Sequence, residues 1–367
     1  MESAGRAALR LQKAFASVNV ESGIVSLQHS IQGGAGVKYL GAWARIVSRI
    51  EDKIQAFLTR KIDKRLGSFS YPVLGNNLAR LEEIKKADVI YIHWALKGLM
   101  NLRSMEQLAG LNKPVVIFLH DMWNITGGCH HSFTCEKYKT EGCNNCPMFS
   151  PGKRNDLSAK EFRKKLKLYS KYNNLFFASP SRWLFDCAKE SLLTKNKPVF
   201  YIPNILDNTL FKPIDKTAAR LILNVDAVET VIAFGAITVS SPYKGWTYLQ
   251  KELELLKQDD SLKNISVLIF GSAYNKEIAD AIPFKTRFMG YLLDEYSTSL
   301  VYNAADVFIA PSLAEAFGYV VMEALSCGTP VVGFNVGGIP DMIRHKENGY
   351  LAKYKDAEDV SEGIKFC

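Results

Sequence analysis

The chain has 367 residues, 47% of them hydrophobic and 23% charged, with 46 Lys and Arg against 37 Asp and Glu, a net charge of +9. This composition excludes a mainly disordered protein, and the length predicts two domains. No run reaches the ~18 consecutive apolar residues of a membrane-spanning helix, and the first residues lack the apolar core of a secretory signal. Seven cysteines, an odd number, argue against a disulfide scaffold and predict a reducing, cytoplasmic location.

The charge is divided unevenly along the chain. Residues 1–200 contain 31 basic and 16 acidic side chains, a net charge of +15, whereas residues 201–367 contain 15 basic and 21 acidic ones, a net charge of −6. Basic side chains cluster at Arg60–Arg65 and at Arg163–Lys167. Such an asymmetry suits a polyanionic partner, either an anionic membrane surface or nucleic acid, but it also suits a solvated basic face without a partner.

Short apolar runs alternate with helical patterns, which predicts an α/β fold with parallel sheets. Strands are expected near Ile24–Leu27, Val89–Ile92, Val115–Leu119, Leu175–Ala178, Val231–Phe234, Val267–Phe270, Val307–Ile309 and Pro330–Gly333. Helices are expected near Ala7–Ser17, Ala42–Leu66, Gly98–Leu108, Ala159–Ser170, Trp183–Ser191, Gly245–Leu256, Leu292–Ala304 and Phe317–Ser326.

Pro203 and Asn204 follow the last apolar run of the first half, and they mark the expected domain boundary. The prediction is an N-terminal domain, residues 1–200, and a C-terminal domain, residues 201–367. Two Rossmann-like domains facing a cleft are the expected architecture, and clefts at domain interfaces are where small ligands bind preferentially.

Both ends of the sequence look cut. A parallel α/β domain normally opens with a buried strand, but Glu2–Gly5 has the character of the turn that follows such a strand. The last residues stop inside a helical pattern. A first strand and C-terminal helices are therefore expected to be missing.

The most informative stretch reads PSLAEAFGYVVMEALSCGTP and follows a predicted strand. Glu315 stands in the loop after that strand and Glu323 within the next helix. The amides of Phe317, Gly318 and Tyr319 could bind a diphosphate, because a helix N-terminus offers unpaired N–H groups and the positive end of its dipole. Glu323 could accept hydrogen bonds from a ribose diol, and Glu315 could contact sugar hydroxyls.

This stretch, together with Gly337–Pro340, resembles the donor-site signature of the family-4 retaining glycosyltransferases, which have the GT-B fold. Further matching segments run through most of the chain: Pro180–Trp183, Ile202–Asn204, Phe211–Pro213, Tyr243–Gly245 and Phe288–Tyr291. The resemblance implies that Glu315 contacts the donor sugar and Glu323 the nucleotide ribose. It also implies that the anomeric configuration is retained and that catalysis needs no divalent cation.

Several glycines take part in the same resemblance. The turn ending at Gly5 resembles the glycine-rich loop that faces the donor phosphates in this family. Gly290 and Tyr291 are expected to contact the nucleotide. Gly235 corresponds to a glycine that ends a strand in this family. In many members of the family an arginine comes directly after that glycine. Here that next position is Ala236, a departure from the pattern.

Lys244 precedes a predicted helix. A lysine there could stabilise the charge that develops on a departing nucleotide diphosphate. Because of Ala236, this stabilisation would depend on Lys244 and the helix amides. A surface lysine without a role is the alternative interpretation.

His120 and Asp121 end a predicted strand at the carboxyl edge of the sheet, where open α/β sheets bind ligands. By resemblance, His120 matches the histidine near the donor sugar and the incoming acceptor. His93, followed by Trp94, ends the preceding strand in the same way, and either a structural or a functional role is consistent with that position.

Four cysteines lie in a Cys-rich loop, residues 121–157. Their spacing, Cys-x5-Cys-x7-Cys-x2-Cys, could close a tetrahedral structural zinc site formed by Cys129, Cys135, Cys143 and Cys146. Reduced cysteines packed in a loop are the alternative. The stretch resembles a subgroup of these transferases that act in surface polysaccharide assembly.

The expected function is that of a retaining glycosyltransferase of the hexosyltransferase type. It would move a sugar from a nucleotide-sugar donor to a glycan or lipid-linked acceptor, at the inner face of the membrane. No catalytic cofactor and no nucleic acid partner are expected. The alternatives are a nucleotide-sugar 2-epimerase of the same fold and a basic, zinc-containing nucleic-acid-binding protein.

Overall fold

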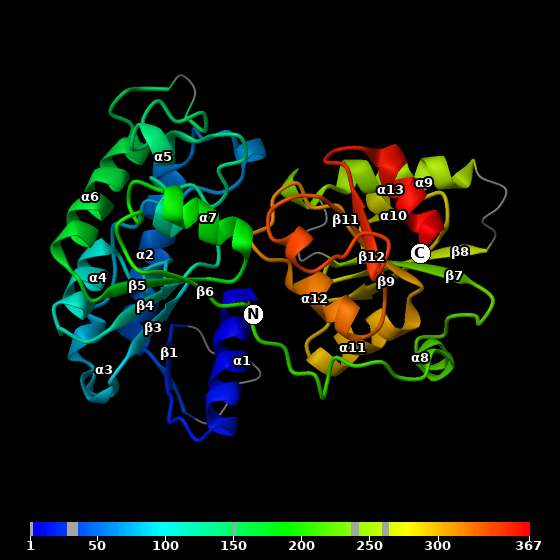
Figure 1. The fold of residues 1–367 in the computed structure, drawn as a ribbon, viewed down its shortest axis with the longest axis horizontal. Helices are drawn as coiled ribbons and strands as arrows, with labels where there is room; N and C mark the ends of the chain where they lie inside the picture. Colours follow the sequence, from blue (N-terminus) through cyan, green and yellow to red (C-terminus); the bar gives the residue numbers. More distant parts are fainter. Residues whose placement is uncertain (1–2, 28–35, 150–151, 236–241, 259–263) are drawn as a thin grey trace. The chain divides into compact units, whose positions relative to one another are not determined.

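The computed structural model describes residues 3–27, 36–149, 152–235, 242–258 and 264–367. The chain divides into two compact units, unit 1 up to Ile205 and unit 2 from Leu206. The boundary expected at residue 200 lies five residues earlier in the chain. Each unit contains a parallel β-sheet with helices packed on it (Figure 1).

Unit 1 contains two parallel sheets, one with the strand order β3-β4-β5-β6 and one formed by β1 and β2. Its strands are β1 (Ile24–Ser26), β2 (Val37–Tyr39), β3 (Ile90–His93), β4 (Val115–Phe118), β5 (Leu175–Ser179) and β6 (Val199–Tyr201). Its helices are α1 (Ser3–Ser17), α2 (Ala42–Leu58), α3 (Glu82–Lys86), α4 (Leu102–Ala109), α5 (Lys137–Thr140), α6 (Leu157–Lys171) and α7 (Arg182–Glu190). Its 3₁₀ turns are η1 (Lys64–Leu66), η2 (Leu78–Arg80) and η3 (Trp123–Ile125).

Side-chain caps set where several helices of unit 1 begin. Asp156 accepts a hydrogen bond from the amide of Ala159 at the start of α6, and Ser181 accepts one from Leu184 at the start of α7. Asn101 and Ser104 form a reciprocal capping box, so α4 begins after Asn101 and not at the predicted Gly98. Residues with short polar side chains thus satisfy amides that have no partner within the helix.

Helix α2 ends at Leu58, eight residues before the end that the sequence pattern predicts. The amide and the hydroxyl of Thr59 both donate to the carbonyl of Gln55, which closes the last turn. The chain then forms a bridge between Ile62 and Phe149 of the Cys-rich loop, so tertiary pairing overrides the local helical pattern. Among the described helices, none combines the length and the apolar character needed to cross a membrane.

Unit 2 contains a six-stranded parallel sheet with the order β12-β11-β10-β7-β8-β9. Its strands are β7 (Thr230–Gly235), β8 (Ile265–Phe270), β9 (Lys285–Gly290), β10 (Val307–Ala310), β11 (Val331–Phe334) and β12 (Gly349–Ala352). Its helices are α8 (Lys216–Ile222), α9 (Trp246–Lys257), α10 (Lys276–Asp280), α11 (Glu295–Ala304), α12 (Tyr319–Ser326) and α13 (Ala357–Phe366). Its 3₁₀ turns are η4 (Pro242–Lys244) and η5 (Ile339–Asp341).

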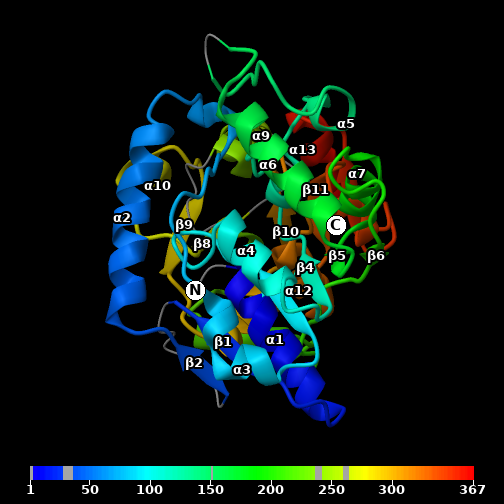
Figure 2. The same cartoon turned by 90° about the vertical axis from the view of Figure 1, so that its left-hand side faces the viewer.

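Apolar side chains cover both faces of the unit 2 sheet. Along β7, Val231 and Ala233 belong to one buried cluster, and Ile232 and Phe234 belong to another. Helices α8, α11 and α12 contribute to the first cluster, and α9, α10 and α13 to the second. Figures 1 and 2 show α9 and α13 on one side of the strands and α12 on the other. This three-layer arrangement explains why the central strands are continuous apolar runs without alternation.

Candidate active site

The order of the strands in unit 2 creates a topological switch point between β7 and β10. From β7 the chain continues outward through β8 and β9, and then returns to the other side of β7 with β10. At such a switch point the loops leave the carboxyl ends of the two neighbouring strands in opposite directions, which opens a crevice for a ligand. Lys244 follows β7 and Glu315 follows β10, so two of the predicted site residues lie at this position.

Lys244 and Glu315 form an ion pair. The Nζ atom of the lysine lies 2.7 Å from Oε2 of the glutamate, and the hydroxyl of Ser312 donates to the same oxygen at 3.4 Å. Both side chains are partly buried. Burial by itself lowers the pKa of Lys244, but the charge of Glu315 and its hydrogen bond outweigh burial and leave the pKa raised. Lys244 is therefore a cation at neutral pH.

Two glycines hold the loops that carry this pair. Gly245 has a φ of +73°, and a Cβ atom there would lie 1.8 Å from the carbonyl oxygen of Pro311. Gly337 has a φ of +57°, and its Cβ atom would lie 1.8 Å from the carbonyl oxygen of Glu315. Only glycine fits at these two positions without moving the backbone. The two glycines therefore let the neighbouring loops approach closely enough to place Lys244 beside Glu315.

Helix α12 begins four residues after Glu315 and two residues after the start that the sequence pattern predicts. Gly318, with a φ of +100°, caps the helix, and Tyr319 is its first residue. Glu323 lies in the buried side of this helix, where its Oε2 accepts a hydrogen bond of 3.1 Å from the hydroxyl of Tyr302 on α11. Tyr302 is a partner that the sequence pattern does not reveal.

The remaining residues predicted to bind the donor lie in different settings. Gly235 ends β7 with the ring of Phe270 packed against it, and Gly290 ends β9 with open space where a Cβ atom would lie. Tyr291, the next residue, is exposed. Ala236, where the resemblance leads one to look for an arginine, lies outside the described residues.

Gly5 is not in a turn, contrary to the prediction. It lies in the first turn of helix α1, which begins at Ser3, four residues before the predicted start. The helix extends this far because Ala4 and Ala7, one turn apart, are both buried.

Unit 1 brings together two histidines at the carboxyl ends of β3 and β4. Nδ1 of His93 lies 2.9 Å from Nε2 of His120, so one ring donates a hydrogen bond to the other. Burial lowers the pKa of His93 to about 3, and the neighbouring His120 adds to the effect. Burial lowers the pKa of His120 to about 4, against the opposing effect of Asp121. Both imidazoles are therefore neutral at pH 7, and His93 is the direct partner of the predicted site residue.

Asp121 organises the loop beside the histidines. One carboxylate oxygen accepts hydrogen bonds from the indole of Trp94, at 3.0 Å, and from Nδ1 of His130, at 2.7 Å. The other accepts the amide of Trp123 at 2.7 Å. Burial raises the pKa of Asp121, but His130 and these hydrogen bonds outweigh it and lower the pKa to about 2. The carboxylate is thus ionised and fixed.

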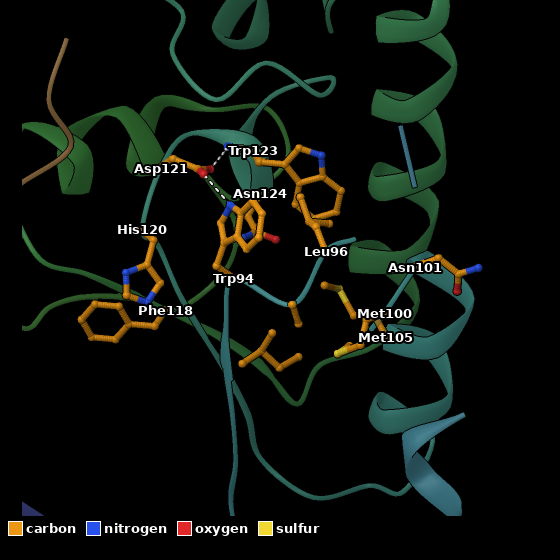
Figure 3. Close-up of a pocket in the computed structure, with 12 residues that line it drawn as sticks. Trp94, Leu96, Met100, Asn101, Met105, Phe118, His120, Asp121, Trp123 and Asn124 are labelled. Atoms are coloured by element: carbon orange, nitrogen blue, oxygen red, sulfur yellow. Dashed lines mark hydrogen bonds between the residues drawn. The ribbon is translucent and has the colours of Figure 1, made fainter. Parts of the chain in front are cut away.

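A small pocket lies next to this network, with about 420 Å³ of empty space that is partly open to solvent. Figure 3 shows Trp94 and Trp123 beside Asp121, with Met100 and Met105 farther along the lining. His120 also contributes to the wall. The pocket therefore combines broad apolar surfaces with a few fixed polar groups.

The four cysteines of the Cys-rich loop are free thiols. Burial raises the pKa of Cys129 to about 12 and that of Cys146 to about 11, and it also raises the pKa of Cys143, whose sulfur accepts the amide of Gly127 at 3.3 Å. In the described part of the chain, no group of three or more cysteine, histidine or acidic side chains is arranged to hold a metal ion. The structure does not show the predicted zinc site.

Comparison with known proteins places the family signal in unit 2. Residues 228–367 match the family described as glycosyl transferases group 1. The D-inositol 3-phosphate glycosyltransferase of Rhodococcus opacus (strain B4) is 34% identical over 171 residues, which cover 43% of this chain and 37% of that protein. Its counterpart from Saccharomonospora viridis is 30% identical over 193 residues, 49% of this chain and 43% of the relative. The chain therefore matches less than half the length of these curated relatives.

Solved structures resemble the chain along its whole length. HepE from Anabaena in complex with UDP-glucose has a TM-score of 0.64 at 17% identity, covering 100% of this chain and 86% of that one. A glycosyltransferase from Rickettsia africae has a TM-score of 0.63 at 14% identity, with coverages of 100% and 85%. At these identities the likeness concerns the fold. The chain has the GT-B fold, and its residues 228–367 are similar to group 1 glycosyl transferases.

Proposed function

We propose that the protein is a retaining glycosyltransferase that moves a hexosyl group from a nucleotide diphosphate sugar to a glycan or lipid-linked acceptor. The observation that carries this proposal is the ion pair of Lys244 and Glu315 at the ends of β7 and β10. The switch point of the sheet thus brings together a fixed cation, an acid and the start of helix α12. Each of these groups fits a different part of an activated sugar.

In the proposed complex, the donor's diphosphate replaces Glu315 as the partner of Lys244. The amides at the start of α12, near Gly318, bind the same phosphates, because they form the positive end of that helix. Glu315 then turns to the hydroxyls of the sugar, and Glu323 accepts hydrogen bonds from the ribose. The similarity to HepE, a structure solved with UDP-glucose, makes a uridine diphosphate sugar the first donor to test.

The reaction that fits these groups is substitution on one face of the sugar. The bond between the anomeric carbon and the diphosphate oxygen breaks, and a bond from that carbon to the acceptor oxygen forms on the same side. The acceptor proton passes to an oxygen of the leaving diphosphate. Lys244 and the α12 amides stabilise the charge that the leaving group gains, which is the largest contribution expected from fixed charges and dipoles.

The pocket of unit 1 is the proposed acceptor site. Trp94 and Trp123 offer flat apolar surfaces, and Asp121 and His120 offer fixed polar atoms. A sugar unit of a glycan presents both apolar C–H faces and hydroxyls, so the chemistry of this pocket suits such an acceptor. A role in surface polysaccharide biosynthesis follows from the resemblance of the Cys-rich loop and is part of the proposal.

The test begins with a thermal-shift panel of nucleotide diphosphates and nucleotide sugars, followed by transfer assays with the donor that stabilises the protein most. Loss of transfer in both Lys244→Ala and Glu315→Ala is expected, with Lys251→Ala, an exposed lysine of α9, as the control. Unchanged turnover in the two site variants would refute the proposal. Conversion of the nucleotide sugar to an epimer without any acceptor would instead establish a 2-epimerase.

A further inference from the structure

Helix α2 packs on unit 1 through a polar face. Its buried residues are Ala44, Ser48 and Glu51. The carboxylate of Glu51 accepts the amides of Val73, at 3.0 Å, and Leu74, at 2.7 Å. A surface helix normally turns its apolar side to the core and its charges to water, so this helix is oriented in the opposite sense.

The face that α2 turns outward carries a stripe of large apolar side chains. Trp43 is 73% exposed and Phe57 62%, and Ile46 and Ile50 between them are also exposed. These positions are separated by three, four and seven residues, so they lie on one side of a helix with 3.6 residues per turn. We call Trp43, Ile46, Ile50 and Phe57 the α2 stripe; its length corresponds to four turns.

Cations line one edge of the α2 stripe. Arg45, Arg49 and Lys53, spaced by four residues, are exposed along the helix, and Arg60 follows its end with the guanidinium carbon 4.5 Å from the ring centre of Phe57. Asp52 is the one exposed acid of the helix, and at two residues from Ile50 it lies on the opposite side from the stripe. The outward face is therefore apolar and positively charged.

We infer that α2 docks the protein flat onto an anionic membrane surface. An amphipathic helix with aromatic and aliphatic side chains on one side and arginine and lysine at its edge lies in the plane of the headgroup region. Tryptophan is enriched at that depth of a membrane. The charge is complementary to that of anionic lipids, which attract each nearby basic side chain.

Two other occupants fit the face less well. In a two-fold dimer built on α2, the same surface would meet itself, and the cations of one copy would face those of the other. A nucleic acid backbone would pair with the arginines but would leave Trp43 and Phe57 in contact with water or phosphate. Acidic lipid matches both the apolar and the charged part. This inference does not depend on the proposed catalytic activity.

The test uses the full chain and sedimentation with vesicles, without substrates. Vesicles of phosphatidylcholine with about 30% phosphatidylglycerol should bind the protein at ~50 mM salt and release most of it at ~500 mM. Trp43 should move to a less polar environment, with a blue shift of its emission that Trp43→Phe abolishes. Pure phosphatidylcholine vesicles should bind weakly.

Paired variants separate the two parts of the face. Arg45→Glu/Arg49→Glu/Lys53→Glu should lower the partition coefficient on the order of ten-thousandfold, because each substitution changes the charge by two units, at about fivefold for each unit. Trp43→Ala/Ile50→Ala should lower it at every salt concentration. Leu221→Ala, an apolar residue 80% exposed on α8, and Lys251→Glu on α9 are the matched controls and should bind like the parent.

Three results would overturn the inference. One is equal binding to neutral and anionic vesicles, and another is binding that the α2 variants leave unchanged while circular dichroism shows them folded. The third is a dimer, measured by light scattering, that Trp43→Ala separates into monomers, since it would assign the α2 stripe to a second copy. Because no donor or acceptor is present, failure here leaves the glycosyltransferase proposal untouched.

Discussion

Lys244 and Glu315 are 71 residues apart in the sequence, yet their charged atoms lie 2.7 Å from each other. The pair exists because β7 and β10 are neighbours in the sheet and both loops leave its carboxyl edge. Glu315 thus occupies the position at which Lys244 is proposed to bind phosphate. Mutation of the two residues should consequently have opposite effects on the affinity for a nucleotide diphosphate.

Lys244→Ala is expected to weaken the binding of uridine diphosphate by about 10- to 100-fold, the loss typical of one hydrogen bond between charged groups. Glu315→Gln is expected to leave that affinity unchanged or to raise it, because it removes the competing carboxylate, while it abolishes transfer. Isothermal titration calorimetry measures both. Equal weakening by the two variants would contradict the exchange of partners proposed for Lys244.

Gly245→Ala should destabilise unit 2 more than Gly290→Ala does. Both glycines have a positive φ, +73° and +66°, so both variants carry the cost of a left-handed residue. Only at Gly245 would the new Cβ atom meet a backbone oxygen, that of Pro311; around Gly290 the space is open. The expected difference in the free energy of unfolding is at least about 1 kcal/mol. Urea denaturation of both variants measures it, and equal values would contradict the role of this contact.

Tyr302→Phe should lower the free energy of unfolding by about 1–3 kcal/mol, because it removes a donor from the buried carboxylate of Glu323. Tyr296→Phe, on the exposed side of the same helix, is the control and should change stability very little. If Glu323 binds the ribose, Tyr302→Phe should also reduce the affinity for nucleotide diphosphates, since the tyrosine positions that carboxylate. A change in stability alone would limit Tyr302 to a structural role.

The His93–His120 pair predicts a loss of stability in weak acid. Their pKa values lie near 3 and 4 in the folded protein, below the 6.5 of an unfolded histidine. Between pH 6.5 and about 4 the unfolded chain therefore binds more protons, and stability falls as the pH falls, by about 1.4 kcal/mol per pH unit for each histidine. Denaturation curves at several pH values, followed by tryptophan fluorescence, measure the slope.

The double variant His93→Gln/His120→Gln should show a smaller slope over the same pH range. His345→Gln, which changes an exposed histidine of unit 2, should retain the parent slope. Because other acids also titrate in this range, the difference between parent and variant isolates the contribution of the pair. No difference would mean that the two histidines are protonated alike in the folded and unfolded states.

Thiol chemistry tests the packing of the Cys-rich loop. Cys129 and Cys146, with pKa values raised to about 12 and 11 by burial, should react very slowly with a disulfide reagent at pH 8, because the thiolate is the reactive form. Denaturation should make all seven cysteines react. Release of about one zinc ion per chain on treatment with a mercurial would instead show that the loop binds metal.

How well the sequence predicts an element depends on how deeply the element is buried. Strand β4 lies within one residue of its prediction, because a strand covered on both faces is an unbroken apolar run. Strand β9 has no such run, since it is an edge strand whose Lys285 and Arg287 pair with Glu229. Nothing local in its sequence distinguishes it from a loop, so it is absent from the prediction.

The same distinction applies to the candidate site. The order of loop, glycine cap and helix from Glu315 to Glu323 is local, and the sequence pattern indicates it. The pairing of His93 with His120 and the hydrogen bond from Tyr302 to Glu323 depend on which strands and helices become neighbours. Spacing along the chain carries no information on those contacts, which is why the sequence identifies single residues and the structure their partners.

The inner contacts of α2 decide how the protein could leave a surface as well as reach it. Glu51 and Gln55 anchor the helix to unit 1 through hydrogen bonds to the backbone of residues 71–74. These hydrogen bonds stay the same whether Trp43 and Phe57 contact water or lipid. Attachment would then cost no unfolding and detachment no refolding. The protein could then move between solution and an anionic membrane surface in response to ionic strength or lipid composition alone.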